Sequence, residues 1–104
     1  DKTFADEFDD YKNGFNRGLT LAQIGLLEEA IAAYNKVLVF KPDEHKALYN
    51  KACCYAQQGK VELAIENLLA AIELNPEEYK IKAQADSDFD KIRQDERFGA
   101  LVTT

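Results

Sequence analysis

The sequence contains few of the residues that form catalytic and metal sites. Its 104 residues include one histidine, two cysteines and five glycines. His45 has no Cys or His at metal-ligand spacing, so we expect it to be a surface residue. The glycines form no phosphate-binding loop, and no motif places a Ser or Cys against a base. We therefore predict that the protein is not an enzyme and uses neither a cofactor nor a metal.

Long hydrophobic runs and an excess of basic charge are also missing. No apolar run approaches the ~18 to 20 residues of a membrane-spanning helix. The 13 basic residues are outnumbered by 19 acidic ones, which gives a formal net charge of −6. This balance disfavours binding to nucleic acid or to an anionic membrane surface. We expect a soluble protein that binds no nucleic acid and does not insert into a membrane.

The start of the chain and its cysteines bear on its origin and compartment. The chain begins with Asp1 rather than Met, and no secretion signal follows. We therefore expect a piece of a longer protein that is not secreted. Cys53 and Cys54 are neighbours, and adjacent side chains on a helix diverge rather than meet. We expect two reduced thiols in an intracellular protein, in the cytoplasm or an organelle interior.

The chain repeats itself after 34 residues. Residues 14–25 align with residues 48–59 without a gap, and Pro42 then falls on Pro76. A fixed period of this length is typical of stacked repeats. Within each unit, apolar residues recur at the i, i+3, i+4 and i+7 spacing of an amphipathic helix. We therefore predict an all-α protein in which each unit is a pair of helices.

Local signals predict where these helices begin and end. Gly25 and Gly59 stand where the first helix of each unit must stop, because Gly adopts the left-handed conformation without a Cβ clash. Asn75 and Pro76 are residue types preferred at the N-cap and at the first helical position. Asp43 is predicted to cap the corresponding earlier helix.

The pattern resembles the tetratricopeptide repeat, a family of antiparallel helix pairs that stack into a right-handed superhelix. The resemblance rests on small residues at helix crossings, on large residues at other signature positions, and on terminal prolines: Gly18, Ala52, Ala30 and Ala64; Leu21, Tyr55, Tyr34 and Leu68; Pro42 and Pro76. Ala64 should accordingly be nearly fully buried. Unit one departs from the pattern at Gly14, where a large residue is usual, and at Val37, where Ala is usual. We expect looser packing there.

The resemblance covers residues 11–78 and implies one domain. Residues 1–44 are predicted to form an N-terminal helix extension with the first repeat, residues 45–78 the second repeat, and residues 79–104 a partial third repeat with capping helices. An apolar stripe at helical spacing indicates that the first helix begins well before the repeat, rather than after a frayed acidic tail. The stripe consists of Phe4, Phe8, Tyr11, Phe15 and Leu19.

The tail is predicted to close the stack, since terminal units must cover one apolar face. Two short helices are indicated by Phe89, Ile92, Phe98 and Leu101. Ser87 and Asp90 are spaced as a capping box, and Asp95 is a cap for the last helix. The alternating Asp86, Asp88 and Asp90 resemble the start of a calcium loop. We expect no calcium site, because Lys91 replaces the required Gly and Arg97 the required Glu.

In this family the first helix of each pair lines a concave face that contacts the ligand. The resemblance therefore implies a protein or peptide partner in the groove, with the protein acting as an adaptor or assembly factor. Carried onto matching positions, the partner-binding residues are Lys12, Phe15, Asn16, Leu19, Gln23, Lys46, Tyr49, Asn50, Cys53, Gln57, Lys80 and Gln84. Apolar members would pack on the partner while the lysines meet its acidic residues. Alternatively, Phe15, Leu19 and Tyr49 belong to the core.

Two other roles are weaker fits. Some tetratricopeptide modules grip the C-terminal carboxylate of chaperones with Lys, Asn and Arg. Asn50 and Lys80 match that clamp, but Phe15, Leu19 and Gln84 stand where its other residues belong. The alternative from another class is a structural or oligomerisation segment of a larger protein, because stacks commonly need about three repeats for stability. We expect a monomer.

Overall fold

The computed structural model describes residues 3–103, and within that range it contains helices and no strand. In chain order the elements are α1 (Phe4–Gln23), α2 (Leu27–Phe40), α3 (His45–Gln57), α4 (Val61–Leu74), α5 (Pro76–Ala85), the 3₁₀ helix η1 (Ser87–Ile92) and α6 (Glu96–Thr103). The all-α prediction is confirmed. None of the described helices combines the length and hydropathy that crossing a membrane requires.

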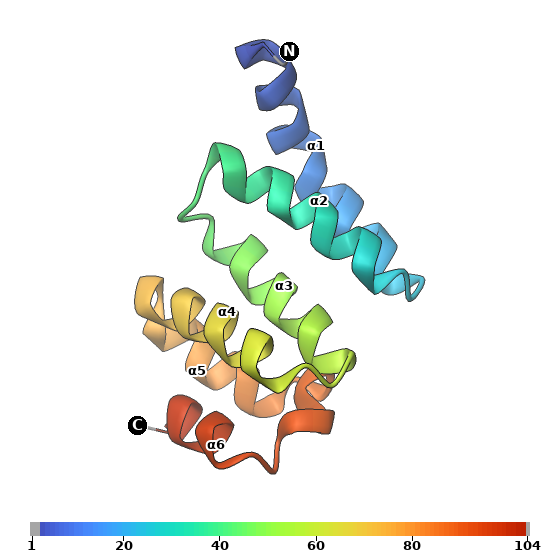
Figure 1. Cartoon of the computed structure of the whole chain (residues 1–104). Coiled ribbons are helices and arrows are strands. Elements are labelled where there is room, and N and C mark those ends of the chain that lie inside the picture. The colour runs from blue at the N-terminus through green and yellow to red at the C-terminus, as the bar shows by residue number, and fades with distance from the viewer. Residues whose placement is uncertain (1–2, 104) are drawn as a thin grey trace.

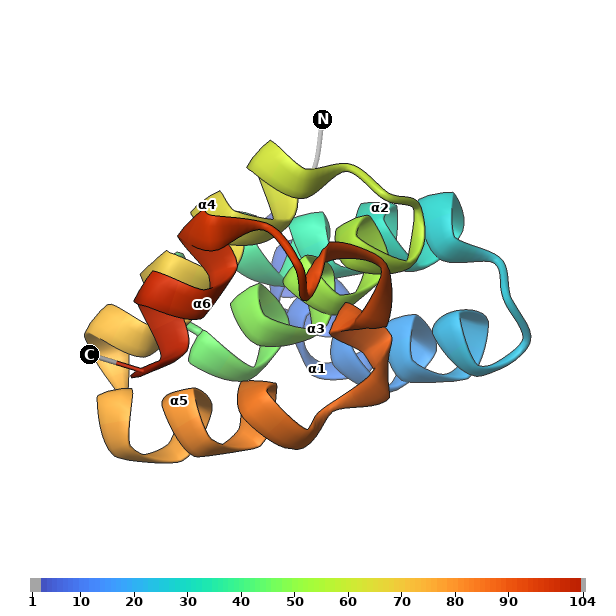
Figure 2. The ribbon, with the colours of Figure 1, turned by 90° about the horizontal axis from the view of Figure 1, so that it is seen from below.

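The helices form two stacked pairs and a closing layer. α1 packs against α2 and α3 against α4, while α2 also contacts α3 and so joins the pairs (Figure 1). In the view from below, α2 and α4 lie above α1, α3 and α5 (Figure 2). The first helices of the units therefore share one side of the stack. α6 packs against α5 and α4 and closes the lower end.

Most helix ends in the two repeats follow the predicted signals. Gly25 and Gly59 have φ values of 85° and 75°, in the left-handed region that favours glycine. Asn75 caps α5 by accepting a hydrogen bond from the Glu78 amide, and Pro76 is the first helical residue. The prediction for Asp43 is wrong. A turn places Glu44, one residue later, at the N-cap of α3, where no side chain caps the helix.

The predicted small residues lie at the helix crossings. Ala30, Ala52 and Ala64 are each 0% exposed, which confirms the predicted register. The looser packing expected in unit one is found on one side of Gly14, where a hollow of about 220 Å³ is lined by Gly14, Leu21 and Ala33, but not toward Val37. A Cβ on Gly14 would lie 2.9 Å from Cγ2 of Val37, which is itself buried. The larger Val37 fills the space that the missing Gly14 side chain leaves, so the two departures compensate.

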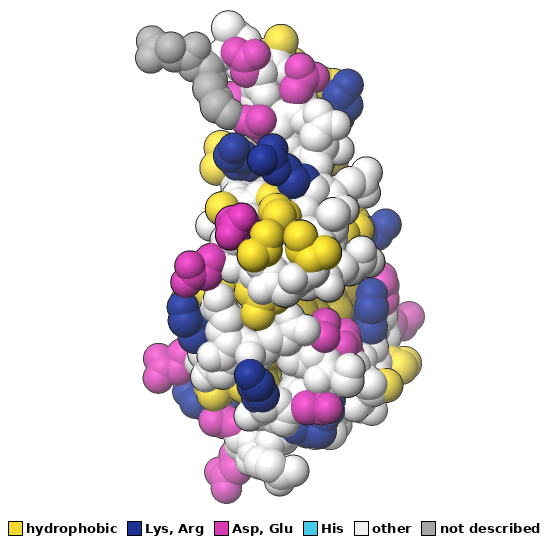
Figure 3. Space-filling model, turned by 90° about the vertical axis from the view of Figure 1, so that its right-hand side faces the viewer, with side chains coloured by type: hydrophobic (Ala, Val, Ile, Leu, Met, Phe, Trp, Pro, Cys, Tyr) yellow, Lys and Arg dark blue, Asp and Glu magenta, His cyan; other side chains and the backbone are white. Residues whose placement is uncertain are grey.

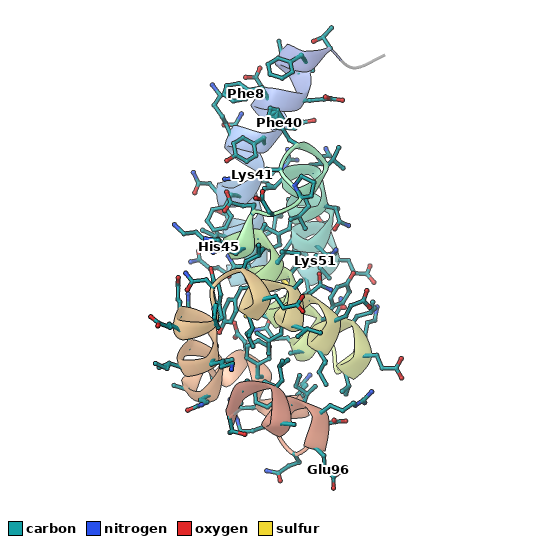
Figure 4. All side chains as sticks on the ribbon, turned by 90° about the vertical axis from the view of Figure 1, so that its left-hand side faces the viewer. Phe8, Phe40, Lys41, His45, Lys51 and Glu96 are labelled. Carbon is teal, nitrogen blue, oxygen red and sulfur yellow. The ribbon has the colours of Figure 1, made fainter. Side chains whose placement is uncertain are left out.

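The N-terminal half of α1 extends beyond the repeat, as predicted. The helix begins at Phe4, and Thr3 and Asp6 form a capping box at its start. Phe8 and Phe40 lie beside each other, with ring centroids 5.6 Å apart (Figure 4). Phe4 also packs on Phe40 but remains 73% exposed. This end of the stack therefore presents an aromatic surface to solvent.

The tail closes the stack, although its first helix differs from the prediction. Residues 87–92 form a 3₁₀ helix, and Asp86 caps it by accepting from the Asp88 amide. The predicted capping box of Ser87 and Asp90 is therefore wrong. Asp95 does accept from the Arg97 amide at the start of α6, as predicted. The apolar tail residues are buried against α3 and α5: Phe89, Ile92, Phe98 and Val102.

Candidate functional site

A groove runs along the side of the stack shared by α1 and α3. It has a volume of about 290 Å³. Its walls come from both repeats and from the tail: Leu19, Ala22, Gln23, Tyr34, Asn50, Cys53, Cys54, Gln57 and Asp88. A second hollow of about 510 Å³ continues it past the turn after α1 and shares Ala22, Gln23, Gln57 and Asp88. We call the two together the inner groove.

Tyr34 belongs to α2, and its ring packs against Gly18 of α1 and lines the inner groove. A Cβ on Gly18 would lie only 2.4 Å from Cε1 of Tyr34, so only glycine leaves room for the ring. Within residues 3–103 no group forms a hydrogen bond with its buried hydroxyl. Burial raises the pKa of the Tyr34 phenol, and the nearby Asn50 amide partly offsets this. The groove thus holds a phenol able to donate or accept a hydrogen bond.

The tail forms one wall of the inner groove by packing on α3. Phe89 meets the Tyr49 ring edge to face at 5.7 Å. The Tyr49 hydroxyl donates to Asp86 Oδ2 over 2.7 Å, and the Gln57 amide donates to Asp88 Oδ1 over 2.8 Å. These bonds fix the two aspartates beside the C-terminal half of α3.

The aspartates and the cysteine of this wall influence one another. Burial, then the neighbouring Asp86, raises the pKa of the Asp88 carboxyl, while the Cys53 thiol and the Gln57 amide oppose the shift. Burial also raises the pKa of the Cys53 thiol, and Asp86 and Asp88 raise it further. A reactive cysteine needs the opposite shift. Cys53 is therefore a poor nucleophile at neutral pH.

Comparison with protein-family models now identifies the repeats. One tetratricopeptide-repeat model matches residues 15–44 and a second matches residues 45–78. Together the matches cover more than half of the chain. The chain belongs to the tetratricopeptide-repeat family. No curated protein sequence and no solved structure gives a significant match.

Tetratricopeptide repeats are protein-interaction modules, and five of the twelve residues predicted to contact a partner line the inner groove. They are Leu19, Gln23, Asn50, Cys53 and Gln57. Phe15 lies next to them and packs on Tyr34, with ring centroids 6.1 Å apart. Asn16 and Lys46 are exposed on α1 and α3. Lys12 is exposed and pairs with Asp9 at 3.9 Å.

The structure corrects several of the expected positions. Tyr49 is 1% exposed and Cys53 6%, because the tail covers them, so neither offers the open apolar surface that we expected. Gln84 donates to the Val102 carbonyl over 2.6 Å and is engaged by the tail. Lys80 lies half-buried on α5. His45 is half-buried rather than a surface residue, with Nδ1 2.5 Å from the Tyr79 hydroxyl.

Three groups in the groove wall lie close enough to hold a metal ion. Ligand atoms of Cys53, Asp86 and Asp88 fall within 4.8 Å of one another. The carboxylates already accept hydrogen bonds from Tyr49, Gln57 and the Asp88 amide. The local geometry is therefore explained by contacts within the chain.

In the first hollow of the inner groove, sequence reasoning missed four residues: Ala22, Tyr34, Cys54 and Asp88. A signal for Tyr34 was present, because unit one has the smallest residue, Gly18, and the larger ring of Tyr34 at the positions where the second repeat has Ala52 and Leu68. No comparable signal existed for Asp88. Its position depends on where the tail crosses α3, and the repeat pattern ends before that point.

Proposed function

We propose that this tetratricopeptide-repeat protein is an adaptor or assembly factor that holds a peptide or helix of a partner protein in the inner groove. The observation that supports this most directly is the composition of the groove. Apolar Leu19 stands beside the amides of Asn50 and Gln57 and beside the Tyr34 hydroxyl, which has no hydrogen-bond partner within residues 3–103. Protein ligand sites typically combine apolar lining with a few placed polar groups in this way.

Apolar surface at the mouth of the groove extends this lining. Ile24 is 66% exposed and Leu26 41%, and both flank Gly25, which lines the second hollow. Hydrophobic side chains gather on the face where this turn lies (Figure 3). Exposed apolar groups beside polar ones are typical of interaction sites. An amphipathic segment of a partner would find contacts of both kinds here.

The test begins with affinity capture from the native extract, followed by mass spectrometry. Calorimetry with the captured partner then compares wild type with Leu19→Asp, which places a charge in the groove. Leu19 suits this purpose better than the buried Tyr49, whose loss would disturb packing. We expect binding to weaken by ~2 kcal/mol or more, the range of a hot-spot residue.

The matched control is Leu69→Asp, which changes an exposed leucine on the outer helix α4, where the side chain is 42% accessible. It should bind like wild type. Equal affinities for wild type and Leu19→Asp, with both proteins folded, would mean that the partner binds elsewhere.

An oligomerisation role is the second candidate, and the aromatic end of the stack favours it. Phe4 is 73% exposed, Phe8 39% and Val39 75%. Exposed apolar clusters of this kind promote self-association. Sedimentation at two concentrations separates the candidates: one mass at both concentrations supports the monomeric adaptor, and a mass that rises with concentration supports self-association. We also propose a reducing intracellular compartment, consistent with the free thiols of Cys53 and Cys54.

A further inference from the structure

Asp88 places a negative charge in the wall of the inner groove, next to the carboxylate of Asp86. Among residues 3–103, no lysine or arginine forms an ion pair with the carboxylate of Asp86 or Asp88. The basic residues of the tail bind other groups: Arg93 pairs with Asp90 at 3.2 Å and Arg97 with Asp95 at 3.0 Å. Lys91 lines the second hollow together with Asp88, and its ammonium group donates to the Gln57 carbonyl over 2.8 Å. Within the described part of the chain, Asp88 of the groove wall and the adjoining Asp86 are therefore without an ion pair.

Of the two carboxylates, Asp88 is the one available to a ligand. Asp86 accepts from the Asp88 amide with Oδ1 and from the Tyr49 hydroxyl with Oδ2, at 3.0 and 2.7 Å. Asp88 accepts one hydrogen bond, from Gln57 to Oδ1, and it lines both hollows of the groove. A carboxylate has about four acceptor sites, so Asp88 retains unused capacity on its groove side.

A second observation in the same hollow also indicates a bound polar group. Tyr34 is 0% exposed, and its hydroxyl lacks a hydrogen-bond partner among the described residues. A buried hydroxyl without a partner costs free energy that a ligand can recover. Tyr34 and Asp88 both line the first hollow, together with Asn50 and Cys53 of α3. A segment lying across α3 would reach both.

We propose that the inner groove recognises a partner segment through a basic side chain, arginine or lysine, that pairs with Asp88. This proposal rests on the proposed function. The backbone of the segment hydrogen-bonds to the Tyr34 hydroxyl and to the Asn50 amide. A cation removes the mutual repulsion of Asp86 and Asp88, whereas an acidic side chain would add to it. The exposed lysines at positions 12 and 46 lie toward the N-terminal ends of their helices, away from this pocket.

The experiment uses two-dimensional NMR of the isotope-labelled full chain. Its probes are four pools of acetylated, amidated heptapeptides with randomised neutral flanks and a fixed central Arg, Lys, Ala or Glu. The Arg and Lys pools should shift the amide signals of Asn50, Gln57 and Asp88 at concentrations about tenfold lower than the Ala pool, as a charge-assisted hydrogen bond requires. The Glu pool should bind more weakly than the Ala pool.

Matched variants assign the preference to one residue. Asp88→Asn keeps an acceptor for Gln57 but removes the charge, and it should abolish the advantage of the Arg and Lys pools. Asp43→Asn makes the same change at an exposed loop position remote from the groove, and it should retain the advantage. A preference that persists in Asp88→Asn would overturn the inference.

The outcomes also separate this inference from the proposed function. If the Ala pool shifts the groove signals as readily as the Arg pool, the basic preference is wrong while groove binding stands. If no pool shifts them and the captured partner cross-links elsewhere, both are wrong. A zinc titration tests the competing ligand. Groove signals that respond to zinc in an Asp88-dependent manner, and to no peptide pool, would overturn the inference in favour of a metal site.

Discussion

The two repeats place equivalent residues in different surroundings. Phe15 and Leu19 of unit one correspond, after the 34-residue shift, to Tyr49 and Cys53 of unit two. The first two are half-buried beside an open groove, whereas Tyr49 and Cys53 are 1% and 6% exposed. The helices that carry them are alike, so the helix itself does not decide the exposure.

The difference arises from the segment that comes after each repeat in the chain. Unit one precedes a second repeat, whose α3 lies beside α1 and leaves the groove between them. Unit two precedes only one further helix of the pattern, and the chain then returns across α3 with Phe89 and Asp86. The surface of a repeat is therefore set by its neighbour as much as by its own sequence. Four substitutions test this explanation.

Removing Phe89 should have the largest effect, because this side chain holds the tail on unit two. Phe89→Ala should destabilise the protein by ~3 to 5 kcal/mol, the usual cost of truncating a buried aromatic. It should also make unit two resemble unit one by uncovering Cys53. Thermal melting measures the first effect. The rate of thiol labelling in a Cys54→Ala background measures the second.

The control for this variant is Phe4→Ala, at an aromatic residue that is 73% exposed. Phe4→Ala should lower the free energy of unfolding far less than Phe89→Ala and leave the rate of Cys53 labelling unchanged. If Phe89→Ala labels no faster than its parent, the tail does not protect Cys53.

A Cβ at Gly18 should break unit one at the point where it differs most from unit two. Gly18→Ala places this atom 2.4 Å from the Tyr34 ring, so we expect a loss of ~2 to 3 kcal/mol through overpacking. Gly99→Ala is the matched control, since nothing lies within 4 Å of its Cβ in α6. It should be stabilising by roughly 0.5 to 1 kcal/mol. Chemical denaturation measures the stability of both variants. If Gly18→Ala is as stable as wild type, the Tyr34 ring does not pack against Gly18.

The hydroxyl of Tyr49 should contribute a smaller amount. Tyr49→Phe removes the 2.7 Å hydrogen bond to Asp86 and turns the residue into the type found at position 15 of unit one. We expect a loss of ~1 to 2 kcal/mol, as for a hydrogen bond to a charged group. Tyr11→Phe, which removes a long 3.4 Å contact to Glu44, should cost less. Equal denaturation midpoints for wild type and Tyr49→Phe would show that the bond adds no stability.

The charge on Asp88 should have the smallest effect, and its sign depends on pH. The folded-state pKa of Asp88 is raised above the ordinary 3.8 by burial and by Asp86. The folded state therefore binds the proton more tightly, so ionising Asp88 at neutral pH costs stability. Asp88→Asn should stabilise by up to roughly 0.5 kcal/mol at pH 7. This advantage should shrink as the pH falls through the raised pKa and vanish near 3.8.

The measurement is a set of denaturation midpoints between pH 3 and pH 8, with Asp43→Asn as the control for a lost surface charge. An advantage that grows on acidification would contradict the predicted sign.

Much of the fold follows from sequence patterns that act within one turn of helix. The left-handed conformation at Gly25 and Gly59 and the Asn75 cap depend on a residue and its immediate neighbours, and all three were predictable. The resemblance to the tetratricopeptide repeat also placed Ala64 at a crossing. Asp43 failed as a cap because a turn shifted the helix start by one residue, a change too small for residue preferences to resolve.

The inner groove was only half predictable, for a different physical reason. Leu19, Asn50 and Gln57 follow from the register of the first helices. The burial of Tyr49 and the position of Asp88 depend on the route of the tail, which obeys no period. The route depends on which apolar surface Phe89 packs against. This is a tertiary contact, and no local sequence pattern predicts it.

The fit between Gly14 and Val37 has a consequence for how this sequence can change. A larger residue at position 14 collides with Val37, and a smaller residue at position 37 leaves a void beside a glycine. Either substitution alone, toward the residue usual in the repeat, is therefore expected to lower stability. The second repeat has both usual residues, Leu48 and Ala71, and packs them well. The stabilities of residues at positions 14 and 37 are therefore coupled, and a consensus redesign of the first repeat has to exchange both residues together.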